Sequence, residues 1–393
     1  MKCPNKASLA LVLIALITLI LALQLASGVH ADAVIDRITL GTPGGYYGAA
    51  YDSVKGEIFI TDADYGSVSV ISDSTNNAVA TINVGSLPFG VVYDSGKGEI
   101  FVANYDSDSV SVIADSNNTV VASINVGSRP TGLAYDSGRS EVFVANRADN
   151  TVSVIADSNN TVVATINAGN SPWDLAYDSA AGEVFLPNYG GDTVSVISDT
   201  TNSVVANVTV GNNPYYAAYD SGMGEIFVTK LDSSSVSVIS DSNNTVVATI
   251  TGLDQPMGAV YDSGKGEIFV ANYGSNSLSV ISDVNNTVVA NIPSVIQPLG
   301  FNYDSGKGEI FVPNSEHGTV SVISDSAETL ASPSPTLGQT PLGSPIPATS
   351  PSPSSALAEA RALSSVGFIL VVVAAVVIVV TLVSLKYKRK AFL

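Results

Sequence analysis

Short runs of apolar residues alternate with small polar turns along most of the chain. Gly90–Tyr93 is a short apolar run, and the turn Asp94–Gly98 after it is rich in residues that tolerate positive φ. Glu99–Asn104 is a second run with β-branched and aromatic residues, and Ser109–Val112 alternates with period two. Another polar turn leads into a fourth run, Thr119–Val126. Four short strands and no helical period predict an all-β fold.

This four-strand unit recurs with a constant period. The tripeptide Tyr-Asp-Ser occurs seven times at intervals of 42 residues, starting at Tyr51, Tyr93, Tyr135, Tyr177, Tyr219, Tyr261 and Tyr303. A Glu-x-Phe motif and a Val-Ser-Val-Ile run recur in every unit, and Leu278 is the only variant of that run. Four strands in about 40 residues are typical of a propeller blade, so the chain is predicted to form a seven-bladed β-propeller with four-stranded blades.

The seventh repeat lacks a fourth strand of its own, because the chain becomes rich in Ser, Ala and Pro after Asp325. Ala33–Leu40 precedes the first repeat and resembles the fourth strand Ala78–Val84. We therefore expect this N-terminal strand to complete the last blade and close the ring, which leaves no long sheet edge unpaired. The propeller is predicted to span residues 32–326.

Two strongly apolar segments flank the repeats. Residues 1–31 combine a basic start, an apolar core and small residues before Asp32, which predicts a cleaved signal peptide, with an uncleaved signal anchor as the alternative. Residues 363–385 are apolar over the length of a transmembrane helix. The basic tail 386–393 should stay cytoplasmic. The sequence thus predicts a single-pass type I protein of the cell membrane with an extracytoplasmic propeller.

A segment of different composition links the propeller to the second apolar segment. Residues 327–362 are rich in Pro, Ser and Thr, with seven prolines between Pro333 and Pro353. Such a composition cannot form a core, so we expect a disordered, extended stalk.

The region between the two apolar segments is strongly acidic. Residues 32–365 hold ten of the 16 basic residues and all 35 acidic ones, a formal net charge of −25. This surface repels nucleic acid and anionic lipid, so we expect no nucleic-acid partner. The sole cysteine, Cys3, lies in the predicted signal peptide, which leaves the mature chain without a disulfide or a thiolate ligand.

The second strands resemble a known repeat family. They read Phe-Val-Ala-Asn at 101–104, 143–146 and 269–272, and Val-Ser-Val-Ile and Asn-Asn-Thr-Val-Val-Ala-Thr-Ile runs follow downstream. Over about residues 33–326 the chain resembles the YVTN-type β-propeller repeat of archaeal and bacterial surface-layer and exported proteins. Asp62 and Lys230 replace the Asn of this motif, which should alter a local turn cap rather than the fold. The resemblance implies a propeller at the cell surface, and fold alone does not fix an activity.

The repeat separates scaffold from candidate site. The Tyr-Asp-Ser and Asp-Ser-Asn-Asn turns on one face are nearly constant, whereas the fourth-to-first and second-to-third loops on the other face vary. The variable loops carry Tyr46, Tyr47, Phe89, Arg129, Arg147, Trp173, Asp174, Tyr189, Tyr215, Tyr216, Lys230, Tyr273 and His317. Aromatic and arginine residues are typical anchors for ligands. The binding candidates are Tyr47, Phe89, Arg129, Trp173, Tyr215, Tyr216 and Lys230, and the alternative is that these loops merely tolerate drift.

Catalysis has little support in the sequence. His317 is the one histidine beyond the predicted signal peptide, so a Ser-His-Asp arrangement would have to use it, and a histidine-ligated zinc or copper site is excluded. Carboxylate chemistry stays open because 35 acidic residues are present. Asp62–Gly66 loosely resembles a calcium loop, but Asp followed by Ser and Gly usually closes a hairpin as an Asx-turn. We expect no catalytic residue, no metal and no cofactor.

Five Asn-x-Ser/Thr sequons make the chain a candidate glycoprotein. The candidate acceptors are Asn117, Asn159, Asn207, Asn243 and Asn285. Four of them arise from the repeated turn, so repetition alone could also explain them.

These observations favour a membrane-anchored cell-surface propeller that serves in adhesion, in surface-layer-like envelope structure or in recognition. Its expected partners are an extracellular protein or glycan, or neighbouring envelope proteins. The alternative is an exported propeller enzyme of the lactonase or hydrolase type that uses carboxylates.

Overall fold

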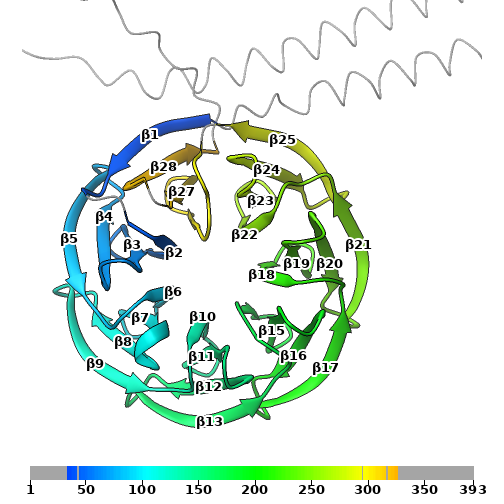
Figure 1. The fold of residues 1–393 in the computed structure, drawn as a ribbon, viewed down its shortest axis with the longest axis horizontal. Helices are drawn as coiled ribbons and strands as arrows, with labels where there is room; N and C mark the ends of the chain where they lie inside the picture. The colour runs from blue at the N-terminus through cyan, green and yellow to red at the C-terminus, as the bar shows by residue number, and fades with distance from the viewer. Residues whose placement is uncertain (1–32, 42–43, 294, 316, 326–393) are drawn as a thin grey trace, which may run out of the picture. The chain divides into compact units, whose positions relative to one another are not determined.

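Seven antiparallel sheets of four strands surround a central axis (Figure 1). The computed structural model describes residues 33–41, 44–293, 295–315 and 317–325. In the first six blades the strands follow one another in sequence from the axis to the rim, whereas the seventh takes its rim strand from the N-terminal end of the described chain. The predicted all-β, seven-bladed propeller with four-stranded blades is confirmed.

The first blade contains β2 (Tyr46–Asp52), β3 (Glu57–Asp62), β4 (Ser67–Ser72) and β5 (Asn77–Asn83), and the second contains β6 (Pro88–Asp94), β7 (Glu99–Asn104), β8 (Ser109–Ala114) and β9 (Thr119–Asn125). The third contains β10 (Pro130–Asp136), β11 (Glu141–Asn146), β12 (Thr151–Ala156) and β13 (Thr161–Asn167), and the fourth contains β14 (Ala176–Asp178), β15 (Glu183–Asn188), β16 (Thr193–Ser198) and β17 (Ser203–Thr209). The fifth contains β18 (Pro214–Asp220), β19 (Glu225–Lys230), β20 (Ser235–Ser240) and β21 (Thr245–Thr251), and the sixth contains β22 (Pro256–Asp262), β23 (Glu267–Asn272), β24 (Ser277–Ser282) and β25 (Thr287–Pro293). The seventh contains β26 (Asn302–Asp304), β27 (Glu309–Asn314), β28 (Thr319–Ser324) and β1 (Ala33–Thr39), and a 3₁₀ turn, η1 (Tyr105–Ser107), follows β7.

The two middle strands of each blade are buried on both faces. In β7, Phe101 and Ala103 belong to the core shared with the third blade, whereas Ile100 and Val102 belong to the core shared with the first. Because successive side chains of a strand point to opposite faces, each middle strand contributes to two cores. The ring is therefore held together by apolar layers between blades.

The strand β1 completes the seventh blade by antiparallel pairing with β28. Ile38 lies opposite Val320 in this ladder and is buried in the core between the seventh and first blades. A register shift occurs between Val34 and Asp36. The prediction that the N-terminal strand closes the ring is confirmed.

The Tyr-Asp-Ser turn is built on its aspartate. Asp94 Oδ1 accepts hydrogen bonds from the backbone N–H groups of Gly96, at 2.8 Å, and Lys97, at 3.1 Å. Gly98 closes the turn with φ of 69°, a conformation that favours glycine. The same two carboxylate contacts recur, for example, at Asp136, Asp220 and Asp304. The Asx-turn interpretation of this motif is confirmed.

The recurring glutamate and lysine of this turn reach the next blade. Glu99 Oε2 accepts a hydrogen bond of 3.3 Å from Asn160 Nδ2, and Lys97 Nζ donates one of 2.7 Å to the Asp157 carbonyl oxygen. The equivalent Glu57, Glu183 and Glu225 contact the corresponding asparagines in the same way. These glutamates therefore join neighbouring blades.

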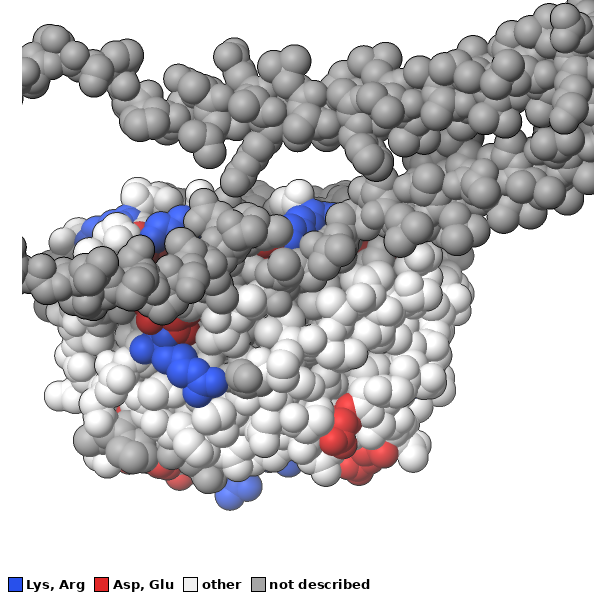
Figure 2. Space-filling model, turned by 90° about the horizontal axis from the view of Figure 1, so that it is seen from above, with Lys and Arg blue, Asp and Glu red and all other residues white. Residues whose placement is uncertain are grey.

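The charged side chains are unevenly distributed over the propeller. Figure 2 shows one flank, where uncharged residues cover most of the described surface and charged ones gather towards its two ends. The rim strands explain this pattern, because β5, β9, β13, β17, β21 and β25 contain no charged residue. Within β1, Asp36 and Arg37 break the rule.

The predicted signal peptide 1–31, stalk 327–362, membrane segment 363–385 and tail 386–393 lie outside the described residues. Among the described residues, no helix has the length and apolar character needed to cross a membrane.

Candidate functional site

The inner strands lie so close around the axis that one position favours glycine. This position is glycine in five blades, at residues 48, 90, 132, 258 and 300. A Cβ atom on Gly90 would lie 2.3 Å from the carbonyl oxygen of Thr131 in the next blade, which no ordinary side chain tolerates. The other two blades, which are neighbours, carry Asp174 and Tyr216 instead. The repeat is thus broken at two adjacent points that face the channel.

In the fourth blade Asp174 precedes a short inner strand. β14 contains three residues, whereas β10 in the preceding blade contains seven. Before β14, only an isolated bridge between Pro172 and Asn188 continues the pairing. The Asp174 carboxylate accepts a hydrogen bond of 3.3 Å from the backbone N–H of Ala217, which places it against the fifth blade.

The residues one position earlier form a ring of seven side chains around the variable-loop end of the channel. We call it the mouth ring, and it consists of Tyr47, Phe89, Thr131, Trp173, Tyr215, Met257 and Leu299. All of these except Met257 line a recess of about 20 Å³, which also reaches Asp174 and Tyr216. The channel is therefore narrowed to a small recess at this end.

Four aromatic members of the mouth ring pack on one another. The ring centroids of Tyr47 and Phe89 are 4.4 Å apart, those of Phe89 and Trp173 are 6.2 Å apart, and Trp173 stacks on Tyr215 at 4.6 Å. Tyr189 adds an edge-to-face contact with Tyr215 at 5.9 Å. These distances are typical of favourable aromatic pairs. Side chains from four blades thus form one continuous aromatic cluster.

Two arginines border this cluster. The guanidinium of Arg147 lies 4.6 Å from the ring centroid of Trp173, and its Nη1 donates a 3.3 Å hydrogen bond to the Tyr105 hydroxyl. Arg129 is exposed and lies 5.5 Å from the Tyr105 ring centroid. Cation–π contacts of this kind fix the arginines beside the aromatic rings. The variable-loop face therefore presents positive charge next to aromatic surface.

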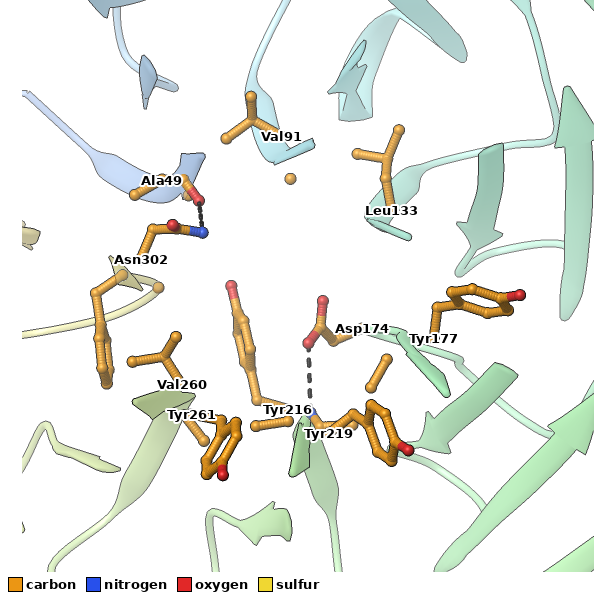
Figure 3. A pocket seen from close by; sticks show the side chains of 18 of the residues that line it. Ala49, Val91, Leu133, Asp174, Tyr177, Tyr216, Tyr219, Val260, Tyr261 and Asn302 are labelled. Atoms are coloured by element: carbon orange, nitrogen blue, oxygen red, sulfur yellow. Dashed lines mark hydrogen bonds between the residues drawn. The ribbon is translucent and has the colours of Figure 1, made fainter. Parts of the chain in front are cut away.

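Below the mouth ring the channel widens into a hollow of about 470 Å³. Its walls are formed mainly by small and apolar residues of the inner strands, including Val91, Leu133 and Val260 (Figure 3). Asp174 is the one charged side chain among the described residues that line it. Asp174 and Tyr216 extend side by side into this space (Figure 3). The hollow continues to Ser221 and Ser263 of the Tyr-Asp-Ser turns at the opposite end.

The electrostatic state of Asp174 follows from its enclosure. Burial raises the pKa of its carboxyl to about 7, although backbone N–H groups of Ala217 and Leu175 favour its anion. Burial likewise raises the pKa of the Tyr216 hydroxyl well above its usual value, and the nearby Asp174 charge adds to this. Strongly shifted carboxyl groups in cavities are frequent at functional sites.

The structure brings together five of the seven predicted binding residues. Tyr47, Phe89, Trp173, Tyr215 and Tyr216 all line the recess, and Arg129 lies at the edge of the aromatic cluster through Tyr105. Lys230 is separate from them. It is only 6% exposed, and its Nζ donates a 3.0 Å hydrogen bond to the carbonyl oxygen of Val210.

Lys230 instead caps a loop, as the sequence comparison with the other repeats predicts. In the second blade the equivalent Asn104 accepts a 3.0 Å hydrogen bond from the Gly85 N–H and donates to Ser111 Oγ at 2.9 Å. In the fifth blade the ammonium of Lys230 contacts the corresponding loop, and β19 keeps its pairing with β20. The replacement changes the local cap and leaves the fold intact. Because it is buried, Lys230 cannot contribute to the exposed face.

The remaining candidates lie away from the channel. The five sequon asparagines, Asn117, Asn159, Asn207, Asn243 and Asn285, are exposed. His317 is also exposed, and its Nδ1 lies 2.9 Å from the Ser315 carbonyl oxygen. Within the described ranges, no group of three or more His, Cys, Asp or Glu side chains is arranged to hold a metal ion.

Sequence reasoning passed over Asp174 as a binding candidate. The signal was nonetheless present, since aligning the seven repeats gives glycine at five positions equivalent to Asp174 and Tyr216. The alignment does not show that these side chains point into the channel. Their direction depends on how closely the inner strands approach the axis.

The comparison with known proteins supports the fold. No family model matches the chain, and no curated protein matches it in sequence. A solved structure of hydrazine synthase from Kuenenia stuttgartiensis is similar, with a TM-score of 0.65 at 17% sequence identity over 73% of this chain and 97% of that one. At this identity the likeness shows only that both chains share a β-propeller fold.

Proposed function

We propose that this protein is a cell-surface recognition module, an exported propeller of the YVTN-repeat type that binds an extracellular protein or glycan at its mouth ring. In this proposal the apolar segment 363–385 anchors the chain in the cell membrane as a type I protein, and residues 327–362 act as a stalk. The apolar and basic patterns of the sequence support the anchor.

The observation that carries the binding role is the aromatic cluster. Tyr47, Phe89, Trp173 and Tyr215 come from four blades and meet at one end of the channel, although a propeller needs no such residues there, since Thr131 and Leu299 occupy equivalent positions. Large aromatic side chains beside arginine are characteristic of binding hot spots. Arg129 and Arg147 also provide positive charge in an otherwise acidic chain.

A binding screen tests this proposal. The full chain would be tested against a panel of glycans and envelope proteins, and Trp173→Ala is expected to weaken any specific binding at least tenfold, because hot-spot truncation costs about 2 kcal/mol or more. Tyr65→Ala is the matched control, since Tyr65 is an exposed aromatic residue of the second-to-third loop of the first blade and lies outside the cluster. Equal binding by both variants would refute the role of the mouth ring.

Lateral assembly into an envelope array is the second candidate function. Six rim strands lack charge and expose valines at equivalent positions: Val79, Val121, Val163, Val205, Val247 and Val289. Strands that lie at the edge of a sheet and carry no charge favour contacts between two copies of the chain. Ordered two-dimensional assembly of the full chain, together with no binding in the screen, would favour this function.

Carboxylate hydrolysis receives less support from the channel. Hydrolytic sites of this kind pair two carboxyl groups across one substrate bond. Asp174 has no carboxylate companion among the described residues that line the hollow. We therefore propose binding rather than catalysis.

A further inference from the structure

The channel contains a second candidate site, in the hollow below the mouth ring. Asp174 and Tyr216 occupy the two neighbouring blades in which the inner-strand glycine is replaced, and both extend into the hollow of about 470 Å³ (Figure 3). Hollows of roughly 300–1,000 Å³ are the usual size for small-molecule sites. A repeat that departs from its own rule at two adjacent positions indicates a use for those side chains.

The chemistry of the hollow restricts its ligand. A carboxylate that is partly withdrawn from water is costly unless it is paired, and among the described residues no Lys, Arg or His side chain pairs with Asp174. An anionic ligand would be repelled by this group. A metal ion requires several oxygen ligands, whereas Asp174 is the one carboxylate among the described residues that line the hollow, and Val91, Leu133 and Val260 add apolar surface beside it.

An organic cation satisfies all of these conditions. Its ammonium group can pair with the Asp174 carboxylate, its alkyl part can contact the apolar walls, and the ring of Tyr216 offers a π face beside the charge. We propose that the propeller channel binds a protonated aliphatic amine, with Asp174 as its counter-ion and Tyr216 as its aromatic neighbour.

The route into this site differs from the surface used in the proposed function. The mouth ring leaves only a recess of about 20 Å³ at the variable-loop end, whereas the hollow extends to Ser221 and Ser263 at the Tyr-Asp-Ser end. The amine therefore enters from the Tyr-Asp-Ser face. This inference does not rest on the proposed function, because Trp173 lines the recess and not the hollow.

Ionisation of Asp174 should control the affinity. The titratable groups that face it are the phenols of Tyr215 and Tyr216, and the phenol of Tyr47 lines the same recess. Burial raises the pKa of both Tyr215 and Tyr216, so they remain neutral near pH 7. With the pKa of Asp174 at about 7, the fraction of carboxylate rises about tenfold between about pH 6 and pH 8. An alkylammonium ion keeps its charge over this range, so its affinity should rise by the same factor.

Calorimetry and saturation-transfer NMR on the full chain test the proposal. The probes are n-butylammonium, the neutral n-butanol and calcium chloride. We expect n-butylammonium to bind saturably in the millimolar range, about tenfold more tightly at the higher pH, and the other two not to bind in the channel. Asp174→Asn should weaken binding at least tenfold and remove its pH dependence.

Further variants separate loss of the site from loss of the fold. Asp174→Gly restores the residue that five other blades carry, so it should fold and fail to bind n-butylammonium. Tyr216→Phe keeps the ring and should retain binding, and Trp173→Ala should retain it as well. The proposal is overturned if Asp174→Asn binds as well as the native chain, if n-butanol binds equally, if calcium displaces n-butylammonium, or if n-butylammonium does not bind at all.

Discussion

At the Tyr-Asp-Ser end of the propeller, carboxyl groups of neighbouring blades lie close to one another where two blades meet. At one junction, burial and the charge of Asp94 raise the pKa of the Asp157 carboxyl, while Lys97 partly offsets this. Burial and the same Asp94 raise the pKa of the Tyr135 hydroxyl to about 12. Burial is also the main cause of raised carboxyl pKa values at Asp115, Asp241, Asp283 and Asp325 at equivalent junctions. These aspartates prefer the protonated form more in the folded than in the unfolded chain.

This preference predicts how stability depends on pH. A group with a raised pKa stabilises the fold at low pH, and that contribution is lost as the pH rises through the raised value. The free energy of unfolding should therefore be larger at about pH 4, near the ordinary pKa of an aspartate, than at about pH 8. The difference should appear in thermal unfolding as several degrees in Tm, since 1 kcal/mol corresponds to about 2–4 °C in a large domain.

A variant at one junction checks the cause of the pH effect. Asp157→Asn removes one of the two facing carboxylates, so it should raise Tm at the higher pH and reduce the pH dependence. Asp106→Asn, at an exposed aspartate of the 3₁₀ turn η1, is the control and should change neither. A Tm that rises with pH in the native chain would contradict this account.

The sequence predicted the wrong surroundings for Lys230. Its charge and its position in a variable loop favoured an exposed binding role. Its aliphatic stem is instead buried, and its ammonium caps the Val210 carbonyl oxygen. The sequence identifies which residue differs from the repeat, but the space available around it decides where its side chain lies.

At the scale of elements, the constant period made the strands predictable. β7 spans Glu99–Asn104, the range expected from the alternation, and β1 ends within one residue of the expected Ala33–Leu40. Short turns fix the pairing register of the strands, so the bounds of most strands follow from the repeat period. The short inner strands β14 and β26, of three residues each, were not predictable, since the repeat period is the same in every blade.

Closure of the ring by β1 has a direct consequence for stability. Ile38 is 4% exposed in the core between the seventh and first blades, whereas Ile35 in the same strand is 42% exposed. Ile38→Ala should lower the free energy of unfolding by about 2–5 kcal/mol, as is usual for a buried aliphatic residue. Ile35→Ala is the control and should change it by about 0.5 kcal/mol or less. Denaturant unfolding that finds equal effects would argue against closure by β1.

At the scale of the whole propeller, the two ends of the channel differ. The Tyr-Asp-Ser end repeats almost the same turn in every blade, whereas the other end gathers Phe89, Trp173 and Tyr215 into the mouth ring. The seven similar blades form the scaffold, and the residues that differ between blades form the candidate binding surfaces. The fold follows from the period, but convergence of the aromatic side chains depends on the ring geometry, which no single repeat encodes.

The most direct test of the recognition role uses the fluorescence of Trp173. This residue is the single tryptophan of the chain, so its emission reports on the mouth ring alone. The full chain would be titrated with tryptophan-free members of the glycan and protein panel while emission is followed alongside calorimetry. The account predicts that at least one ligand changes the emission saturably, with the midpoint that calorimetry gives. Binding that leaves the emission unchanged, or a panel without any ligand, would contradict it.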